Sequence, residues 1–586
     1  MKEINLFEQS DKYRVVFDID SDNRNFTYCK IYAPSDQLYR RVVGCLQSSF
    51  TFDDPGAAHS WDVKNGFSDG KVALFNKSNH SLELGLVTRA YKILHAAIPE
   101  LVIEFAKPIW DIFKKPGGNM TTDEVSAYIE SLNIYNIPDD KKMTPYEHQV
   151  NLVEKAINGR RISIVACTSS GKSLSQYVIS RYLNEVEKKK VLLVVPSSGL
   201  VEQMYSDFKN DYGWREIDDH CTLIYMDSKD KLSKADKTKL AELNLGEEVM
   251  LKDVVISTWQ SLLKKPLKFF ECFGAVLVDE AHGSKADELK RIINQCVNAQ
   301  WKIGVSGTIP DNGLDAALIE GSLGRREVIV KTHELIAKGI LTPVEIHVLG
   351  LPYEPEIRTY LCARKYAEEY SLIIGNGSRK KVVDVMVEAN HLNINENNLM
   401  LFKRKESIDA MEEYFAEKYP QFKIYVIKGE VPAITREQYR KAVNAGTGAI
   451  ILATYGTMKQ GVNIKFLHNL FFMEFSKSMY EIVQSIGRVV RFHPLKKLAK
   501  VYDVVDDASY ITRKGAGKVK ENYAMKHYRE RQKYYAEEQF PVIEYLLPIT
   551  VTVDPADLDR KEKEAEKTAS KRKKVEGKGK KSMFSF

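Results

Sequence analysis

The feature that most constrains this chain is a phosphate-binding loop pattern near residue 170. An apolar, β-branched run from Ile162 to Ala166 leads into a loop of small residues, and Gly171-Lys172-Ser173 opens a helix-forming segment. Small residues let successive backbone N–H groups turn inward around phosphate oxygens, and the helix adds its positive N-terminal end. The pattern predicts a nucleotide site, and the alternative is a Ser-rich turn before a surface helix.

The residue types in the loop suggest a division of roles. Lys172 is expected to reach the β- and γ-phosphates, and the Ser173 hydroxyl is expected to hold Mg²⁺. The strict pattern has a glycine where this chain has Ala166, which is also small. The remaining residues predicted to line the phosphates of ATP are Thr168, Ser169, Ser170 and Gly171.

Composition places the chain among ordinary globular proteins. Its 586 residues suggest three or four domains, with 44% hydrophobic and 28% charged residues. The apolar runs are too short to span a bilayer, and the N-terminus lacks a secretory pattern. Seven scattered cysteines without a C-x-x-C pair indicate reduced thiols. We therefore expect a cytoplasmic protein without a membrane partner.

The net charge of +7 is concentrated at one end of the chain. Residues 567–581 contain eight Lys or Arg and one Glu, so they account for the whole of it. Nucleic-acid binding by the folded body must therefore come from local patches. We expect a disordered Lys-rich tail over 554–586. It ends in Phe584 and Phe586, which suggest docking to a protein partner, or only a solvated tail.

Residues 1–140 carry no nucleotide motif and predict a small α+β domain. Trp61, Lys64, Phe67 and Lys71 interleave aromatic and basic side chains, which suits a nucleic-acid surface. The alternative is that Trp61 and Phe67 are core residues. Both interpretations remain open from the sequence.

A capped helix precedes the phosphate loop. Thr144 is expected to be the N-cap, Pro145 the first helical residue, and Glu147 the partner in a capping box. Gln149, 23 positions before Lys172, can offer a donor and an acceptor to an adenine edge, and Tyr146 can stack on the ring.

Strands and helices then alternate twice, which predicts two parallel α/β domains with ligands at the carboxyl edges of their strands. In the first, Asp279 and Glu280 follow an apolar strand. One carboxylate is expected to complete Mg²⁺ ligation and the other to deprotonate the attacking water. In the second, Arg488 and Arg491 are expected to share one helix face and to meet the charge on the γ-phosphate.

Together these segments resemble the conserved motifs of superfamily 2 helicases, in the family order, over residues 144 to about 506. The segment with Tyr146 and Gln149 resembles the adenine-recognising Q motif. The resemblance continues through the strings ACTSSGKS, PSSGLVEQ, STWQ, DEAH, SGT, ATYGTMKQGVNI and QSIGRVVR. Within the superfamily the chain most resembles the UvsW-type phage helicases, which remodel recombination and stalled-fork DNA. A DEAH string also occurs in RNA helicases, so it does not select the substrate.

The resemblance implies further site residues. Gln484 joins the two arginines in the catalytic set, while Gly461 and Asn463 contact the nucleotide and Ser306 and Thr308 couple hydrolysis to movement. Two departures are Ser169, in place of a glycine, and Asn463, in place of an acidic ribose-contacting residue. Residues expected near the nucleic-acid backbone are Pro196, Ser197, Ser257, Thr258, Trp259 and Thr454.

The sequence thus predicts two tandem RecA-like parallel-sheet domains between a small α+β domain and a basic tail. The expected ranges are 1–140 for the nucleic-acid-binding domain, 141–330 and 331–510 for the RecA-like domains, 511–553 for a helical extension and 554–586 for the tail. The expected activity is ATP-dependent unwinding or branch migration of branched DNA, with duplex and single-stranded DNA as further substrates. The alternatives are an RNA helicase, a duplex translocase that does not separate strands, and a binding protein that uses ATP only as a clamp.

Overall fold

A computed structural model describes residues 13–19, 27–54, 57, 61–113, 118–225, 251–281, 286–310, 313–458, 464–512 and 517–551. The chain divides into two compact units, Met1–Lys331 and Thr332–Phe586. In the described part, no helix is both long and apolar enough to cross a membrane. All seven cysteines are free thiols, as the sequence predicts.

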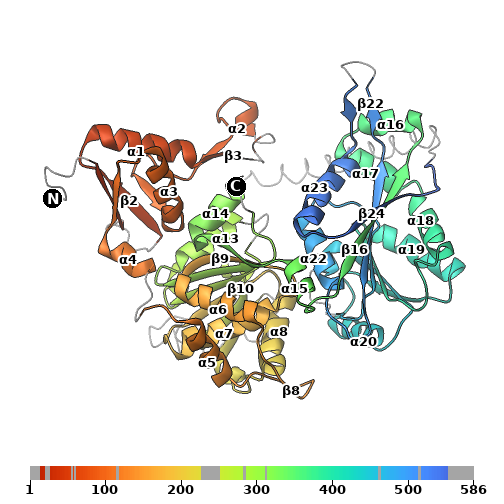
Figure 1. Ribbon diagram of the computed structural model, residues 1–586, viewed down its shortest axis with the longest axis horizontal. Helices are drawn as coiled ribbons and strands as arrows, with labels where there is room; N and C mark the ends of the chain where they lie inside the picture. Colours follow the sequence, from red (N-terminus) through yellow and green to blue (C-terminus); the bar gives the residue numbers. More distant parts are fainter. Residues whose placement is uncertain are drawn as a thin grey trace, which may run out of the picture. The chain divides into compact units, whose positions relative to one another are not determined.

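The N-terminal domain of the first unit has a four-stranded sheet with its own apolar core. The strand order is β5-β2-β1-β6, and β1 pairs antiparallel with β2 but parallel with β6. Helices α1 and α3 bury their apolar faces against the sheet, and α2 with β3 projects from the rest of the domain (Figure 1). The elements are β1 (Arg14–Ile19), β2 (Tyr28–Tyr32), α1 (Asp36–Ser49), β3 (Thr51–Asp53), α2 (Trp61–Lys64), β4 (Lys71–Ala73), β5 (Ser81–Glu83), α3 (Val87–Ala97), β6 (Val102–Phe105) and α4 (Lys107–Phe113). The next helix, α5 (Thr122–Ser131), packs on α6 (Glu147–Gly159) of the following domain, where the Thr122 hydroxyl donates to Glu154 at 2.7 Å.

The second part of this unit is a seven-stranded, all-parallel sheet in the order β11-β12-β10-β13-β14-β9-β15. Its central strands are fully buried because helices cover both faces, α6 and α7 on one and α13 and α14 on the other (Figure 1). The strands are β9 (Arg161–Ala166), β10 (Val191–Val195), β11 (Cys221–Ile224), β12 (Val254–Thr258), β13 (Ala275–Asp279), β14 (Trp301–Ser306) and β15 (Arg326–Val330). The helices are α6 (Glu147–Gly159), α7 (Lys172–Glu185), α8 (Ser198–Ser206), α9 (Ile217–His220), α11 (Trp259–Leu262), α12 (Leu267–Phe270), α13 (Ala286–Gln295) and α14 (Gly313–Leu323).

The second unit repeats this architecture with a sheet in the order β18-β19-β17-β20-β21-β16-β24, again all parallel. The strands are β16 (Val344–Pro352), β17 (Asn398–Phe402), β18 (Lys423–Ile427), β19 (Ala449–Thr454), β20 (Asn469–Phe472), β21 (Ala499–Asp507) and β24 (Val542–Leu546). The helices are α15 (Thr332–Ala337), α16 (Pro355–Cys362), α17 (Tyr366–Ile374), α18 (Ser378–Glu388), α19 (Lys405–Lys418), α20 (Ala433–Asn444), α21 (Tyr455–Met458), α22 (Met479–Val489) and α23 (Tyr523–Glu537). The predicted fold class, two tandem RecA-like parallel sheets behind a small α+β domain, is confirmed.

One expected element needs correction. The sequence predicts a helical extension over 511–553, but α23 is the one helix among the described residues of that range, and β24 pairs with β16 as an edge strand of the sheet. The buried Arg531 of α23 donates two hydrogen bonds to Asp503 of β21, at 2.8 and 2.9 Å. Strand β24 is therefore part of the second sheet, and α23 is tied to that sheet through Asp503. The Lys-rich tail, 554–586, lies outside the described residues.

A smaller difference concerns the helix before the phosphate loop. Tyr146, not Thr144, is the N-cap of α6, and the capping box pairs Tyr146 with Gln149. The helix ends at Gly159. Glu147 is likewise three residues after Thr144, so the spacing does not select the start; the bond made is the one in which Oε1 of Gln149 accepts from the Tyr146 N–H at 2.9 Å.

Candidate active site

Three neighbouring strands of the first sheet bring the predicted catalytic residues to one edge. Strand β14 lies between β9 and β13, and all three run parallel. Their carboxyl ends therefore place the phosphate loop, Ser306 and Asp279 side by side. In open parallel sheets, ligands bind at the carboxyl ends of the strands.

The loop after β9 contains two left-handed residues, Ser169 with φ of 68° and Gly171 with φ of 81°. Such residues turn neighbouring N–H groups toward one side, which favours anion binding. Gly171 also caps α7, and a β-carbon there would lie 2.0 Å from Nε2 of Gln149. Glycine is required at 171 because of both its conformation and this close approach.

Gln149 holds the loop against the start of α6. Its Oε1 accepts from the Tyr146 N–H at 2.9 Å, and its Nε2 donates to the Ser170 carbonyl at 3.1 Å. The buried His148 ring also approaches that carbonyl, with Nε2 2.8 Å from the oxygen. Tyr146 is half-exposed and stacks on His148 at 5.7 Å. Gln149 therefore positions the loop, and adenine recognition by Gln149 and Tyr146 stays a prediction.

Lys172 and Ser173, at the start of α7, have partners within the chain. The Lys172 ammonium donates to the carbonyls of Ala166 and Cys167, both at 3.2 Å. The Ser173 hydroxyl lies 2.6 Å from that of Tyr212. Both groups are thus held at the loop by the chain itself, and their contacts with phosphate and magnesium stay predictions. Thr168 and Ser170 are buried in the same loop.

Asp279 ends β13 and faces α7. Its Oδ1 accepts from Nε2 of Gln176 at 2.8 Å. Burial, and after it the charge of Glu280, raises the pKa of the Asp279 carboxyl to about 7, although Lys172 acts in the opposite direction. Burial and the neighbouring negative charge disfavour the ionised form of Asp279. A divalent cation bound beside it would supply a compensating positive charge and favour the carboxylate form.

Glu280 connects the end of β13 to the end of β14. Its backbone is left-handed, with φ of 53°, and its N–H donates to the Val305 carbonyl at 2.8 Å. The hydroxyl of buried Ser306 donates to Oε2 of Glu280 at 2.9 Å, and the Thr308 N–H donates to Ser306 Oγ at 3.2 Å. A left-handed backbone costs a non-glycine residue about 1 kcal/mol or more. It is retained here where the side chain must reach Ser306.

In the first unit, the residues predicted to meet nucleic acid lie at the carboxyl ends of β10 and β12, along the same side of the sheet as the phosphate loop. The Ser257 hydroxyl donates to the Ile224 carbonyl at 2.8 Å, and Thr258 caps α11 through Ser261. Both are buried, so their hydroxyls stabilise the chain itself. The more accessible positions are Pro196, Ser197 and Trp259. Contact with a nucleic-acid backbone remains a prediction for all of them.

In the second unit, the predicted arginines differ in their placement. Arg488 is buried in the last turn of α22, whereas Arg491 lies beyond the helix end at Val489. The expectation that both occupy one helix face is therefore wrong for Arg491. Gln484 lies on the same helix and is half-buried, and Thr454 hydrogen-bonds Thr457 at the start of α21. Gly461 and Asn463 lie outside the described residues.

On the N-terminal domain, Trp61 and Phe67 are not core residues. Their side chains are 68% and 73% exposed, and the rings stack at 5.4 Å with an interplanar angle of 14°. Lys71 is exposed in the neighbouring strand β4. The structure thus removes the core alternative and leaves a paired aromatic surface.

Sequence reasoning missed several residues that position the site. Gln176 was detectable, because it lies four residues after Lys172 and so shares its helix face. His148, Tyr212 and Lys496 gave no local signal. Lys496 donates to the Val489 carbonyl at 2.7 Å at the end of α22, and burial, followed by Arg491, lowers its pKa to about 7.

Two family models match the chain. The model described as the res subunit of type III restriction enzymes covers residues 142–311, and the helicase conserved C-terminal domain covers residues 379–493. The first match contains the phosphate loop, Asp279 and Ser306, and the second contains Arg488 and Arg491.

One curated relative spans most of the chain. The ATP-dependent DNA helicase uvsW of Enterobacteria phage T4 is 29% identical over 499 residues, which are 84% of this chain and 93% of that protein. Its crystal structure aligns at 26% identity with a TM-score of 0.45, covering 91% of this chain and 99% of that one. The DNA-bound restriction-modification enzyme LlaBIII aligns at 18% identity with a TM-score of 0.49, covering 70% of this chain and 32% of that one.

Proposed function

This chain belongs to superfamily 2 of the helicases, and from that premise we propose that it is an ATP-dependent DNA helicase that unwinds or branch-migrates branched DNA. The observation that carries the proposal is the shared edge of Lys172, Asp279 and Glu280 on a chain that aligns with a phage DNA helicase over most of its length. Branched DNA as substrate rests on the resemblance to UvsW-type enzymes.

ATP and Mg²⁺ fit the residues at this edge. The left-handed loop supplies N–H groups for phosphates, and Lys172 supplies a positive charge. Ser173 and Asp279 would ligate magnesium, since a hydroxyl, a carboxylate and phosphate oxygens are its usual ligands. When bound, the ion neutralises part of the phosphate charge.

Hydrolysis requires a base, and Glu280 is assigned that role. Its carboxylate is held by the Ser306 hydroxyl, which orients it without removing its charge. It would accept a proton from the attacking water while Asp279 keeps its place beside Lys172. Ser306 also accepts a hydrogen bond from the Thr308 N–H. A movement of the Glu280 side chain would therefore shift Ser306 and, through it, the loop after β14, which is the predicted coupling segment.

Arg488 and Arg491 are assigned to the charge that develops on the γ-phosphate, with Gln484 beside them. Alternating affinity for the DNA strand between the ATP-bound and ATP-free forms would convert hydrolysis into stepping. The N-terminal domain is assigned to branched DNA, with Trp61 and Phe67 as stacking surfaces. The proposal includes a cytoplasmic location, in the bacterial host if a phage encodes the chain. A replication or recombination protein that docks the tail at Phe584 and Phe586 stays a prediction.

The decisive experiment for the function is ATPase activity measured with five additions: none, single-stranded DNA, linear duplex, forked DNA and RNA. We expect the largest stimulation with forked DNA. Stimulation by RNA alone would select the RNA-helicase alternative, and equal stimulation by linear duplex without strand separation would select the translocase. Binding of ATP without turnover under every condition would select a nucleotide clamp.

A further inference from the structure

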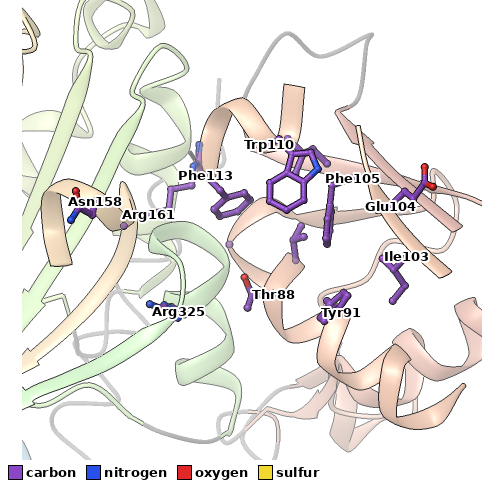
Figure 2. A pocket seen from close by; sticks show the side chains of 14 residues that line it. Thr88, Tyr91, Ile103, Glu104, Phe105, Trp110, Phe113, Asn158, Arg161 and Arg325 are labelled. Atoms are coloured by element: carbon purple, nitrogen blue, oxygen red, sulfur yellow. The ribbon is translucent and has the colours of Figure 1, made fainter. Parts of the chain in front are cut away.

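A cavity of about 780 Å³ lies where the N-terminal domain packs on the first RecA-like domain. Figure 2 shows its two walls, with rings from α3, β6 and α4 on one side and polar side chains from the RecA-like domain on the other. Ligand sites have volumes of roughly 300 to 1,000 Å³, so the cavity is large enough for a small ligand or for part of a polymer. No predicted site residue lines it.

The first wall is aromatic and partly open. Trp110 packs edge-on against Phe105 with ring centroids 5.6 Å apart, and Tyr91 lies 6.1 Å from Phe105. Trp110 is 56% exposed and Tyr91 38% exposed, although both belong to a folded domain with its own core. Exposed aromatic faces beside a cavity are a frequent sign of a binding site.

The second wall is basic. It contains Arg161, which is buried, and Arg325, which is exposed and pairs with Glu327 at 2.9 Å. A smaller cavity of about 300 Å³ shares Arg161 and adds Arg160 and Lys107. Burial and the nearby Arg160 lower the pKa of the Arg161 guanidinium to about 9, so this cluster favours an anion.

Carboxylates in the two cavities are already paired. Asp111 bonds Lys107 at 2.6 Å, and Glu104 forms an ion pair with Arg14. Their charges are therefore compensated within the protein. Because Lys107 and Arg325 are also paired, with Asp111 and Glu327, the positive balance of the combined lining comes from Arg160 and Arg161.

The two walls are fixed relative to each other by close packing. A β-carbon on Gly85 would lie 2.0 Å from the Glu320 carbonyl oxygen, so the two backbones are in direct contact. Nearby, Lys290 pairs with the buried Glu83 at 2.8 Å, and Arg89 pairs with Glu320 at 3.4 Å. A cavity between such walls is preformed, which lowers the cost of binding.

The cavity is separate from the nucleotide site. Arg161 begins β9, and the phosphate loop follows Ala166 at the other end of the same strand. Six residues of strand span about 20 Å. One buried strand thus links the cavity to the loop.

We propose that this cavity holds an unpaired base of a DNA strand, stacked on Trp110 and Tyr91, with its adjoining phosphate toward Arg161 and Arg325. Every base has a π face and every nucleotide a negative phosphate, so a ring-lined wall opposite a basic wall matches both parts. An apolar peptide would use the rings but not the arginines. The inference deepens the proposed function and rests on it, because branched DNA supplies unpaired bases.

The test is equilibrium binding of a fluorescent single-stranded oligonucleotide to the full-length protein without ATP. Trp110→Ala should weaken binding about tenfold, in line with the loss of one stacked base, and Trp110→Phe should restore most of it. Tyr91→Ala should also weaken binding. Tyr13→Ala is the matched control, since Tyr13 is 40% exposed on the same domain and does not line the cavity.

A second measurement does not depend on any variant folding. An oligonucleotide carrying 5-iododeoxyuridine, irradiated with the unaltered protein, should crosslink to Trp110 or Tyr91. Crosslinks confined to other residues, or equal affinity of Trp110→Ala and wild type, would overturn the inference. Loss of deoxynucleoside monophosphate binding in Trp110→Ala with oligonucleotide binding intact would also overturn it, because the ligand would then be a free nucleotide.

The same samples separate this inference from the proposed function. If wild type shows no DNA-stimulated ATPase, the helicase proposal fails. If wild type is stimulated by DNA and Trp110→Ala binds it equally well, only the cavity inference fails.

Discussion

Strands β13 and β21 end in the same pattern, an apolar run followed by two carboxylates, yet their partners differ. Asp279, at the end of β13, accepts from the neutral Gln176 amide. Asp506, at the end of β21, receives two hydrogen bonds from Arg379, at 2.9 and 2.6 Å, and one from the Tyr353 hydroxyl at 2.8 Å. The first carboxylate keeps a high pKa, while the second is neutralised by a buried guanidinium.

The same strand ending can therefore either offer a carboxylate to a cation or hold a helix against the sheet. Where no guanidinium bonds the carboxylate, the negative charge is available for a cation, and the neighbouring Glu280 holds a left-handed backbone. Where an arginine is buried beside it, the carboxylate fixes α18 to the sheet. We therefore expect changes at β13 to alter turnover and changes at β21 to alter stability.

The largest expected effect is at the first strand end. Glu280→Gln should lower ATP turnover by about 10²- to 10⁴-fold, because the amide cannot accept the proton from water. ATP binding should persist, since Asp279 and Lys172 remain. Near-normal turnover in Glu280→Gln, measured by phosphate release, would show that Glu280 is not the base.

Lys172→Ala should lose ATP binding and turnover together.

Arg491→Ala should lower turnover by roughly 10³-fold, as for other arginines that meet a γ-phosphate. DNA affinity should be largely kept. Arg215→Ala, at an exposed arginine that belongs to no proposed site, gives the reference for losing one surface charge. A decrease smaller than about tenfold in steady-state ATPase would mean that Arg491 acts elsewhere.

At the second strand end, Asp506→Asn should destabilise the second unit by about 3–5 kcal/mol, because the buried Arg379 keeps its charge without a matching carboxylate. Turnover per folded molecule should change little. Denaturant unfolding measures the loss. The double variant Asp506→Leu with Arg379→Met should recover much of it, and equal stability of all three would refute the structural role.

The raised pKa of Asp279 gives a pH test. Its folded-state pKa, about 7, exceeds the usual 3.8, so the folded protein binds the extra proton between these values. Stability from this group is therefore present at pH 4 and decreases as pH rises to 7. Asp279→Asn should have the higher melting temperature at pH 8, without Mg²⁺, and little advantage at pH 4. A pH-independent difference would contradict the assigned cause.

The smallest expected effect concerns the loop. Ser169 has φ of 68°, which glycine adopts without the steric cost of a side chain. Ser169→Gly should therefore stabilise the protein by about 1 kcal/mol or less. Thermal unfolding with Ala166→Gly as the control, at a position in β9, measures it. A stabilisation by Ala166→Gly of the same size would show that the left-handed conformation is not the reason.

Much of the α/β core was predictable because buried parallel strands are continuous apolar runs. Strands β9, β10, β13 and β19 coincide with the runs that the sequence shows. The edge strand β24 was missed, since its residues are exposed and only pairing with β16 makes them a strand. Strand β16 was missed as well, because its sequence, VEIHVLGLP, mixes polar residues and glycine into the run.

The site was predictable only where residues follow one another in sequence. The local sequence is enough to recognise Gly171, Lys172 and Ser173 as a phosphate-binding loop and to single out the Asp279-Glu280 pair. The partners that decide their chemistry come from distant segments, such as Tyr212 for Ser173 and Ser306 for Glu280. No local pattern distinguishes Asp279 from Asp506, because Arg379 lies 127 residues away from Asp506.

We propose that ATP hydrolysis at the carboxyl end of β13 drives separation of DNA strands. The most direct measurement is strand displacement from a forked DNA with ATP and Mg²⁺, comparing wild type with Glu280→Gln. We expect wild type to displace a strand from the fork and Glu280→Gln to displace none, although the variant still binds the fork. Displacement by Glu280→Gln at the wild-type rate, or none by wild type with active ATPase, would contradict it.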